Sequence, residues 1–289
     1  MMYAITGITG QVGGVVARKL LAAGKPVRAV VRSAAKGVPW LQQGCELAIA
    51  EMADAEALSH AFDGAEGVFV LLPPHFDPSP DFAETRRNVA ALYEALLQAR
   101  PAKVVCLSTV GAQATQPNLL TQLQIMEQQL GTLPMPIAFL RAAWFMENAA
   151  WDVAAARDEG VLRSYLQPLA RPIPMVATAD VGKVAAELLL TSWVGQRIVE
   201  LEAEQRISPL ELAAALARLL GREVKAEAVP REQWETQFRA QGMQNPLPRM
   251  QMLDGFNAGW IDFDGGASRS RKGVTGLDTV LRQLIAQAV

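Results

Sequence analysis

The chain has 289 residues, of which 51% are hydrophobic and 19% are charged, and its formal net charge is −2 at pH 7. This composition excludes a disordered chain, and it lacks the basic excess that a nucleic-acid-binding protein carries. No apolar run approaches the roughly 20 residues that a bilayer-spanning helix needs. We therefore expect a globular protein with one large domain, or one large and one small domain, and no nucleic-acid or membrane partner.

Cysteine and histidine are scarce, with two residues of each. Cys45 and Cys106 fall in apolar segments and are expected to be reduced core thiols, which is typical of a cytoplasmic protein. Because the cysteines and histidines lie far apart in the sequence, we expect no transition-metal site. The first apolar strand begins directly at the N-terminus, so we also expect no signal peptide.

The first fourteen residues predict a dinucleotide site. Met2–Thr6 has strand character, a glycine-rich turn follows, and apolar residues at helical spacing begin at Val12. Strand, glycine turn and helix in this order hold a pyrophosphate. Gly7 allows the tight turn, Gly10 lets the backbone approach the phosphates, and Gly13 lets the helix pack on the strand. The candidate cofactor-binding residues of this turn are Gly7, Thr9, Gly10, Gln11, Val12 and Gly13.

The end of the second predicted strand, Val27–Val31, bears on the choice of cofactor. An NAD enzyme usually has Asp or Glu just past this strand, where the carboxylate binds the ribose hydroxyls. This chain has Arg32 there, with Lys36 four residues later. A guanidinium pairs with a 2′-phosphate, which a carboxylate would repel. Two solvated cations beside a loop are the alternative interpretation. We expect NADP(H) to be preferred over NAD(H).

The next strands are predicted at Cys45–Ala50 and Gly67–Leu72, the second a continuous apolar run typical of a sheet covered on both faces. Between them, Asp54 is expected to cap a short helix. Met52 is a candidate contact for the adenine ring, although core packing is the simpler interpretation. Leu72, which ends the fourth strand, and Pro73 are further candidate cofactor contacts.

A stiff loop with four prolines occupies residues 73–80, at the sheet edge where α/β proteins bind ligands. His75 is a candidate proton donor, with an ordinary loop histidine as the alternative. Phe76 is a candidate wall for an aromatic substrate. A long helix is expected to begin after Asp81.

The rest of the chain predicts two more core strands and a smaller unit. The core strands are Val104–Leu107 and Ile137–Arg141, and Trp144–Asn148 is expected to open the following helix. After about residue 155 come shorter segments, namely a helix capped by Thr178-Ala179-Asp180, a strand at Ile198–Leu201, a helix from Ser208-Pro209 to Gly221, a half-exposed strand at 224–228 and a C-terminal helix from Leu277. We expect a doubly wound parallel α/β sheet of Rossmann type over residues 1–155, completed by part of 175–205, and a smaller α/β lid within 156–289.

Four motifs resemble those of one family of atypical short-chain dehydrogenases. They are the spacing Gly-x-x-Gly-x-x-Gly with threonine before its first two glycines, Val30-Val31-Arg32-Ser33, Phe139-Leu140-Arg141 with Phe145-Met146-Glu147-Asn148, and Ala179-Asp180-Val181. Together they resemble the NmrA-like branch, which includes NADPH-dependent quinone reductases and NADP-sensing regulators. The resemblance extends over nearly the whole chain.

The resemblance implies roles for residues at the sheet edge. A serine at the position of Ser108 polarises the substrate carbonyl and contacts the cofactor in related dehydrogenases. A small residue that closes a strand is the alternative interpretation. The turn after the sixth strand flanks nicotinamide and substrate in relatives. Trp144, Phe145 and Asn148 are therefore candidate substrate-pocket residues, although aromatic residues at this point also serve as core.

One expected feature of short-chain dehydrogenases is missing. The usual Tyr-x-x-x-Lys pair does not occur, because Gly7, Leu97 and Leu169 follow the three tyrosines at that spacing. Hydride transfer must then suit an acceptor that needs little acid assistance, such as a quinone. The leading hypothesis is an NADPH-dependent reductase of a quinone or similar flat carbonyl compound. The rival is a non-catalytic NADP(H)-binding redox sensor. A homodimer or a regulatory protein partner is compatible with either hypothesis.

Overall fold

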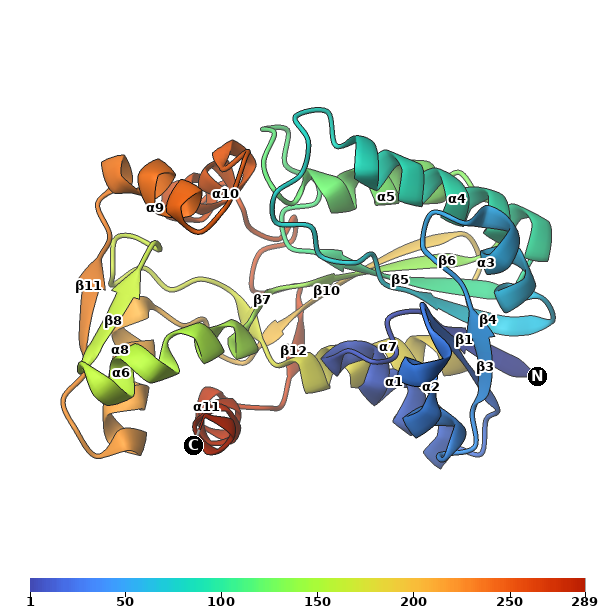
Figure 1. The fold of residues 1–289 in the computed structure, drawn as a ribbon, viewed down its shortest axis with the longest axis horizontal. Coiled ribbons are helices and arrows are strands. Elements are labelled where there is room, and N and C mark those ends of the chain that lie inside the picture. The colour runs from blue at the N-terminus through green and yellow to red at the C-terminus, as the bar shows by residue number, and fades with distance from the viewer. Residues whose placement is uncertain (289) are drawn as a thin grey trace.

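The larger part of the molecule is built around a parallel eight-stranded sheet in the computed structural model, which describes residues 1–288 (Figure 1). Its strand order is β12-β10-β6-β5-β4-β1-β2-β3, and all the neighbouring pairs run parallel. The run from β3 through β1 to β6 has the order of the doubly wound dinucleotide-binding fold. The predicted α/β fold class is confirmed.

The strands of this sheet are short and mostly buried. They are β1 (Met2–Ile5), β2 (Val27–Val31), β3 (Glu46–Ile49), β4 (Ala65–Val70), β5 (Lys103–Thr109), β6 (Ile137–Ala142), β10 (Gln196–Ala203) and β12 (Arg271–Gly273). All residues of β6 are buried, because helices cover both faces of the sheet there. The β3 strand lies at one edge and is half exposed, with a pattern in which no residue is fully buried.

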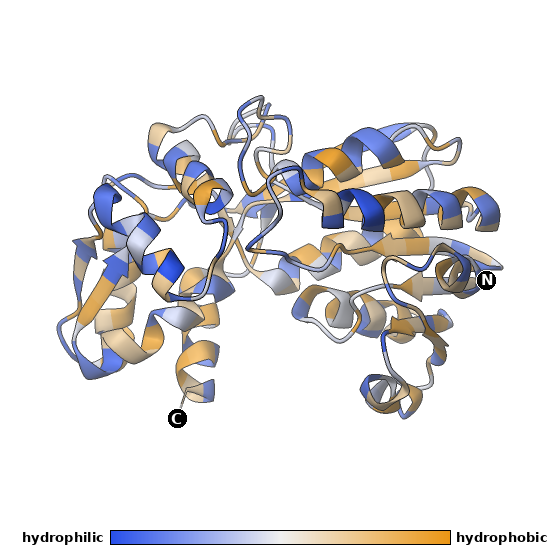
Figure 2. Cartoon of the chain, turned by 45° about the horizontal axis from the view of Figure 1, so that its top comes forward, coloured by the Kyte–Doolittle hydropathy of each residue, from blue (hydrophilic) through white to orange (hydrophobic). Residues whose placement is uncertain are grey.

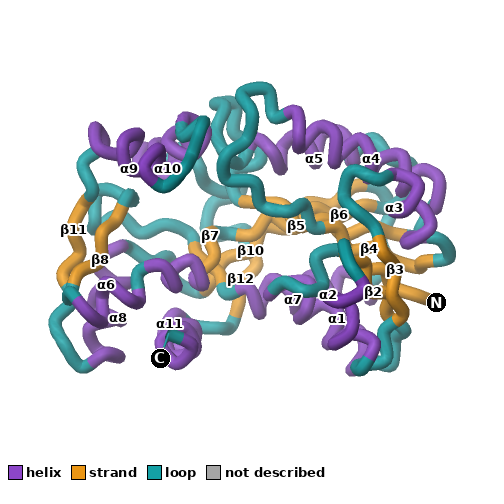
Figure 3. Tube along the Cα trace, in the orientation of Figure 1, coloured by secondary structure: helices purple, strands orange, loops and turns teal. Residues whose placement is uncertain are grey.

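Two helical layers cover the sheet, as the tube in Figure 3 shows. One layer contains α1 (Gln11–Ala22), α2 (Ala34–Leu41) and α7 (Thr178–Leu190), and the other contains α3 (Ala55–Phe62), α4 (Ala83–Ala99) and α5 (Thr121–Leu130). Because successive side chains of a strand point to opposite faces, Tyr3 and Ile5 join one hydrophobic cluster and Ala4 joins the other. Both faces of the sheet are therefore core.

Further elements form what we call the lid unit. They are the parallel pair β8 (Val161–Ser164) and β11 (Lys225–Ala228), with helices α6 (Val153–Asp158), α8 (Pro209–Leu220), α9 (Trp234–Ala240), α10 (Leu247–Ala258) and α11 (Leu277–Gln287). Ser208 and Glu211 form a reciprocal capping box at the start of α8. In Figure 2 hydrophobic residues run through the helices of this unit as well as through the sheet, as expected of elements that share a core.

The predicted division of the chain near residue 155 remains a prediction. The sheet takes β10 from the segment 175–205 that was expected to complete it, and it also takes β12 from further along the chain. Sequence reasoning did not predict β12, because three residues with a lysine and an arginine carry no strand pattern. The chain thus passes from the sheet to the lid unit and back again more than once.

The segment after β6 is not the helix that the sequence predicted. Trp144–Phe145 forms a short strand, β7, which pairs with β9 (Met175–Val176), and a 3₁₀ helix, η1 (Met146–Trp151), follows. The backbone N–H of Trp144 donates to the carbonyl of Pro174 at 3.1 Å. Pairing with a segment distant in sequence therefore holds Trp144 and Phe145 in an extended conformation.

The start of α7 also differs from the prediction. Glu147, from η1, accepts hydrogen bonds from the backbone N–H and the hydroxyl of Thr178 at 2.9 and 2.7 Å. Asp180 instead accepts from the backbone N–H of Thr275 at 2.7 Å. The cap of this helix is supplied from elsewhere in the chain, and its own carboxylate holds the segment after β12.

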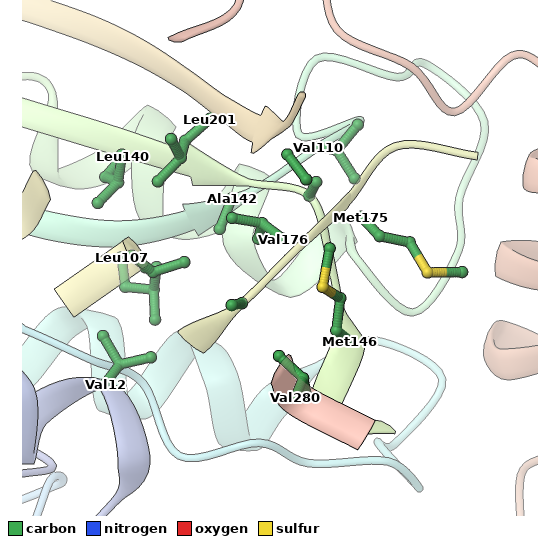
Figure 4. Packing of buried hydrophobic residues seen from close by; sticks show 14 of the residues in the cluster. Val12, Leu107, Val110, Leu140, Ala142, Met146, Met175, Val176, Leu201 and Val280 are labelled. Atoms are coloured by element: carbon green, nitrogen blue, oxygen red, sulfur yellow. The ribbon is translucent and has the colours of Figure 1, made fainter. Parts of the chain in front are cut away.

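The core continues from the sheet into the lid unit. Figure 4 shows Leu107 of β5, Val176 of β9 and Val280 of α11 in one packed group with Val12 of α1. All four side chains are buried. This shared packing fixes the lid unit at the carboxyl edge of the sheet, where the candidate site lies.

Candidate functional site

The glycine turn joins β1 to α1 at the carboxyl edge of the sheet. Gly7 has φ +61°, a conformation that side chains disfavour, and its carbonyl accepts a hydrogen bond from Gly10 N–H at 3.0 Å. A Cβ atom on Gly13 would lie 2.3 Å from the Gly7 carbonyl oxygen. The turn and the first turn of α1 therefore approach each other as closely as glycine allows.

The first turn of α1 fits an anion. Its N-cap residue is Gly10, without a side-chain cap, so no side chain competes for the N–H groups of Gln11, Val12 and Gly13. A Cβ on Gly10 would meet only the Gly7 carbonyl, at 3.3 Å, so no side chain fills the space beside it. Open N–H groups at the positive end of a helix are suited to the pyrophosphate of a dinucleotide.

The corner beyond β2 is cationic. Arg32 and Lys36 are exposed, and neither forms an ion pair within residues 1–288. Arg18 of α1 lies on the same side, with its guanidinium carbon 5.7 Å from the Trp40 ring centre. No carboxylate occurs between residues 32 and 36, so nothing there would repel a phosphate. Sequence reasoning did not single out Arg18, because its position becomes meaningful only when α1 and α2 pack together.

A large cavity of about 1120 Å³ lies between this edge of the sheet and the lid unit. Several residues that the sequence predicted as site residues line it, namely Gln11, Val12, Leu72, Pro73, His75, Phe76, Ser108, Trp144, Phe145 and Asn148. Gly7, Thr9, Gly10, Gly13, Arg32 and Lys36 lie in the turn and at the corner described above. Met52 instead packs against the hydrophobic cluster that contains Phe62, which agrees with the simpler interpretation of this residue. The assigned roles of all these residues remain predictions.

Ser108 lines the cavity, but its hydroxyl is engaged. It donates to Oε1 of Glu127 on α5 at 2.5 Å. Arg141 of β6 holds the same carboxylate with Nε at 3.0 Å and Nη2 at 2.7 Å. Both charged side chains are nearly buried, at 5% and 9% exposure. To polarise a substrate carbonyl, Ser108 would have to give up a charge-assisted hydrogen bond.

Hydrogen bonds join the proline loop to the segment between α9 and α10 of the lid unit. Asp77 accepts hydrogen bonds from the backbone N–H groups of Gln244 and Asn245, at 2.8 and 2.7 Å. His75 is exposed and lines the cavity, while its carbonyl accepts from Gln122 at 2.9 Å. The ring of Phe76 packs edge-on against Trp151 of η1, with ring centres 6.4 Å apart. The loop thus forms part of the cavity wall.

The turn after β6 supplies an aromatic side to the cavity. Trp144 packs edge-on against Phe256 of α10 at 5.3 Å between ring centres, and Phe145 follows it into the cavity wall. Asn148 is half buried, and its side chain has no hydrogen-bond partner within the described part of the chain. An apolar slot with a free amide suits a flat ligand with a polar substituent.

Three polar residues of the cavity were missed by sequence reasoning. Asp152 follows η1, and its carboxylate has no ion pair or hydrogen bond in residues 1–288; burial raises the pKa of this carboxyl to about 6. Tyr165 donates its hydroxyl to Gln237 at 2.8 Å. Arg249 comes from the first turn of α10. No local motif marks any of them, because each acquires its setting from distant segments.

The fold and the turn geometry agree with comparisons to known proteins. A model of the NmrA-like family matches residues 2–262. The chain belongs to the NmrA-like family. This confirms the family resemblance that the motifs predicted.

Individual members and structures of this kind are similar over most of the chain. An NAD(P)H azoreductase of Xenophilus azovorans is 28% identical over 85% of this chain and 83% of its own length. Quinone oxidoreductase 2 of Escherichia coli K12 is 25% identical over 93% of this chain and 88% of its own. The structure of Citrobacter sp. triphenylmethane reductase complexed with NADP(H) superposes with a TM-score of 0.82, covering 98% of this chain and all of that one at 22% identity.

These relatives agree with the predicted class of NAD(P)H-dependent oxidoreductase and with NADP(H) as the predicted cofactor.

Two further findings, on membrane-spanning helices and on metal sites, concern residues 1–288 alone. No helix among them is long and apolar enough to cross a bilayer. No cluster of three or more histidine, cysteine, aspartate or glutamate side chains among them is arranged to hold a metal ion.

Proposed function

We propose that this NmrA-like protein uses NADPH to reduce a flat, conjugated acceptor, with a quinone as the expected class. The observation that carries the proposal is that the start of α1 and the aromatic turn after β6 line one cavity, through Gln11, Val12, Trp144 and Phe145. A cofactor on the glycine turn and a flat ligand against the aromatic side would then share that space. The names of the two relatives, an azoreductase and a quinone oxidoreductase, support the same class of acceptor.

NADPH supplies the hydride when it is bound. The backbone N–H groups of the first turn of α1 would hold its pyrophosphate. Arg32 and Lys36 would face its 2′-phosphate, and this favours NADPH over NADH. The apolar wall of the cavity excludes water from the space between cofactor and acceptor. The protein's contribution is thus binding, orientation and exclusion of water.

Among the residues that the structure describes, no acid of the Tyr-Lys type faces the cavity. Tyr165 lines it, but its hydroxyl donates to Gln237, and Tyr3 is buried with its pKa raised to about 12 by burial and by Glu66. A ketone becomes an alkoxide on accepting hydride and needs a positioned acid. A quinone becomes a hydroquinone anion, whose charge is spread over the ring and which water protonates.

The proposal is tested by following NADPH oxidation with small quinones and with unactivated ketones. We expect turnover with quinones and almost none with the ketones. Ser108→Ala and His75→Ala should each slow quinone reduction by less than about tenfold, since loss of an essential general acid costs about a hundredfold or more. Brisk reduction of unactivated ketones would overturn the mechanism. Tight NADPH binding without oxidation by any quinone would favour the non-catalytic NADP(H) sensor. Such a sensor would act through a homodimer or a regulatory protein partner.

A further inference from the structure

Arg249 is a cation on the cavity wall, and no acidic side chain of residues 1–288 pairs with it. Its guanidinium carbon lies 4.4 Å from the ring centre of Phe238, and Nη1 lies 3.7 Å from the sulfur of Met243. Neither neighbour neutralises its charge, and it forms no ion pair within residues 1–288. Burial lowers the pKa of Arg249 below its usual value, which only the hydroxyl of Tyr165 partly offsets. The group is thus a partly desolvated and uncompensated charge.

Several other arginines of the same region are paired with carboxylates. Four of them have a carboxylate at hydrogen-bond distance: Arg206 with Asp262, Arg218 with Asp278, Arg231 with Asp254 and Arg239 with Glu235. Asp254 is especially informative, because it lies on the same helix as Arg249 and yet pairs with Arg231 on η2 (Arg231–Gln233). The lid unit therefore has carboxylates, but none is placed on Arg249.

The carboxylates of the cavity itself do not fill this role either. Glu84 accepts a hydrogen bond from the hydroxyl of Ser79 at 2.8 Å, at the base of the proline loop. Asp152 forms no ion pair within residues 1–288, with Arg249 or with any other cation, and burial raises the pKa of its carboxyl. An unpaired cation in an apolar setting is costly, and it is stabilised when a ligand brings the opposite charge.

We propose that Arg249 binds an acidic substituent of the acceptor, so that the substrate is a flat conjugated compound carrying a carboxylate or a sulfonate. The inference rests on the proposed function and adds the chemical class of the substrate to it. The guanidinium presents a fork of N–H donors that matches two oxygens of such a group. Packing on Phe238 limits the orientations of the fork, so that less freedom is lost on binding.

The test compares a naphthoquinone sulfonate and a naphthoquinone carboxylate with unsubstituted naphthoquinone in NADPH oxidation. We expect Arg249→Gln to raise KM for both acidic quinones by roughly tenfold to a hundredfold, as for a lost charge-assisted hydrogen bond. KM for the neutral quinone should stay within about twofold. Arg249→Lys keeps the charge but not the fork and should restore part of the loss. Arg239→Gln, at an exposed lid arginine, is the matched control and should change neither value.

Calorimetric titration of the NADP⁺-bound protein with naphthoquinone sulfonate separates this inference from the proposed function. If no quinone is reduced, wild type should still bind the sulfonate more tightly than Arg249→Gln does, and the anion site would survive the failure of the reductase proposal. Equal losses with acidic and neutral quinones would overturn the inference. So would a raised KM for NADPH alone, or unchanged kinetics and binding in Arg249→Gln. If that variant does not fold, Arg249→Lys must show the selective loss.

Discussion

The glycine turn and the wall of the cavity lie at the same edge of the sheet, but they are built in different ways. The turn lies within residues 7–13, and its binding groups are backbone N–H donors at the start of α1. The wall takes side chains from the loop after β4, from β5, from the junction of η1 and α6, and from α10; among them are His75, Ser108, Asp152 and Arg249. The first is a local structure, and the second is an assembly of distant parts.

This difference between backbone and side-chain groups decides which of them are free to bind a ligand. A backbone N–H at a helix start has no partner by construction, so the turn is open wherever its glycines are present. A side chain on the cavity wall is open only if no neighbour engages it. Ser108 donates to Glu127, whereas no opposite charge within the described residues pairs with Asp152 or Arg249. Residue type alone therefore says little about availability in the cavity.

The largest expected effect is at the buried pair beneath the cavity wall. Glu127→Ala leaves the guanidinium of Arg141 and the hydroxyl of Ser108 without their shared acceptor. Removing one partner of a buried ion pair costs about 3–5 kcal/mol. Because Arg141 keeps Asp264 at 3.0 Å, we expect about 3 kcal/mol. Urea denaturation measures the loss.

Glu235→Ala is the matched control for that change. Glu235 pairs with Arg239 on the surface of α9, where both side chains are more than half exposed, at 56% and 53%. An exposed pair of this kind contributes within about 0.5 kcal/mol. Equal destabilisation by the two substitutions would show that the buried Ser108–Glu127–Arg141 network contributes no more to stability than an exposed ion pair.

The next effect tests the cationic corner of the cofactor half. Arg32→Asp should narrow or reverse the preference for NADPH over NADH, because a charge-assisted hydrogen bond contributes roughly 1.5–3 kcal/mol, or about one to two decades in affinity. Titration with both nucleotides gives the ratio. Lys19→Glu, at an exposed lysine in the last turn of α1, should leave it unchanged. Wild type that binds NADH as tightly as NADPH would contradict the assignment of this corner.

The smallest expected effect is a pH dependence that originates at Asp152. Burial raises its folded-state pKa to about 6 from 3.8, so the folded chain retains a proton that the unfolded chain has lost. The free energy of unfolding should therefore fall as the pH rises through this window, by about 2 kcal/mol between about pH 4.5 and about pH 7.5. Above the window the cost stays constant.

Asp152→Asn should remove this component of the pH profile and stabilise the protein at the upper end of the window. The comparison variant is Asp158→Asn, because Asp158 is exposed and Arg157 lowers its pKa by hydrogen bonding. That substitution should have a small effect, since solvent screens an exposed pair. If the free energy of unfolding falls between the two pH values to the same extent in wild type and in Asp152→Asn, the titrating group lies elsewhere.

The sequence by itself determined the local parts of this protein. A few neighbouring residues specify each of these parts: the glycine turn, the cations after β2, the continuous apolar strands and the capping box of α8. Helix and strand periodicity and the special conformations of glycine act over that same short range. The fold class, the family and the position of the cofactor turn could be inferred for this reason.

Only the tertiary structure decided how distant residues meet. The pairing of β7 with β9 replaced the helix expected at Trp144–Asn148, and β12 joined the sheet without a strand pattern of its own. The hydrogen bond from Ser108 to Glu127 joins two elements that share no motif. The lone charge of Arg249 likewise depends on which partner Asp254 finds. Such contacts depend on burial and on which of several possible partners a side chain or strand finds. Those partners lie far apart in the sequence, so no short stretch contains them all.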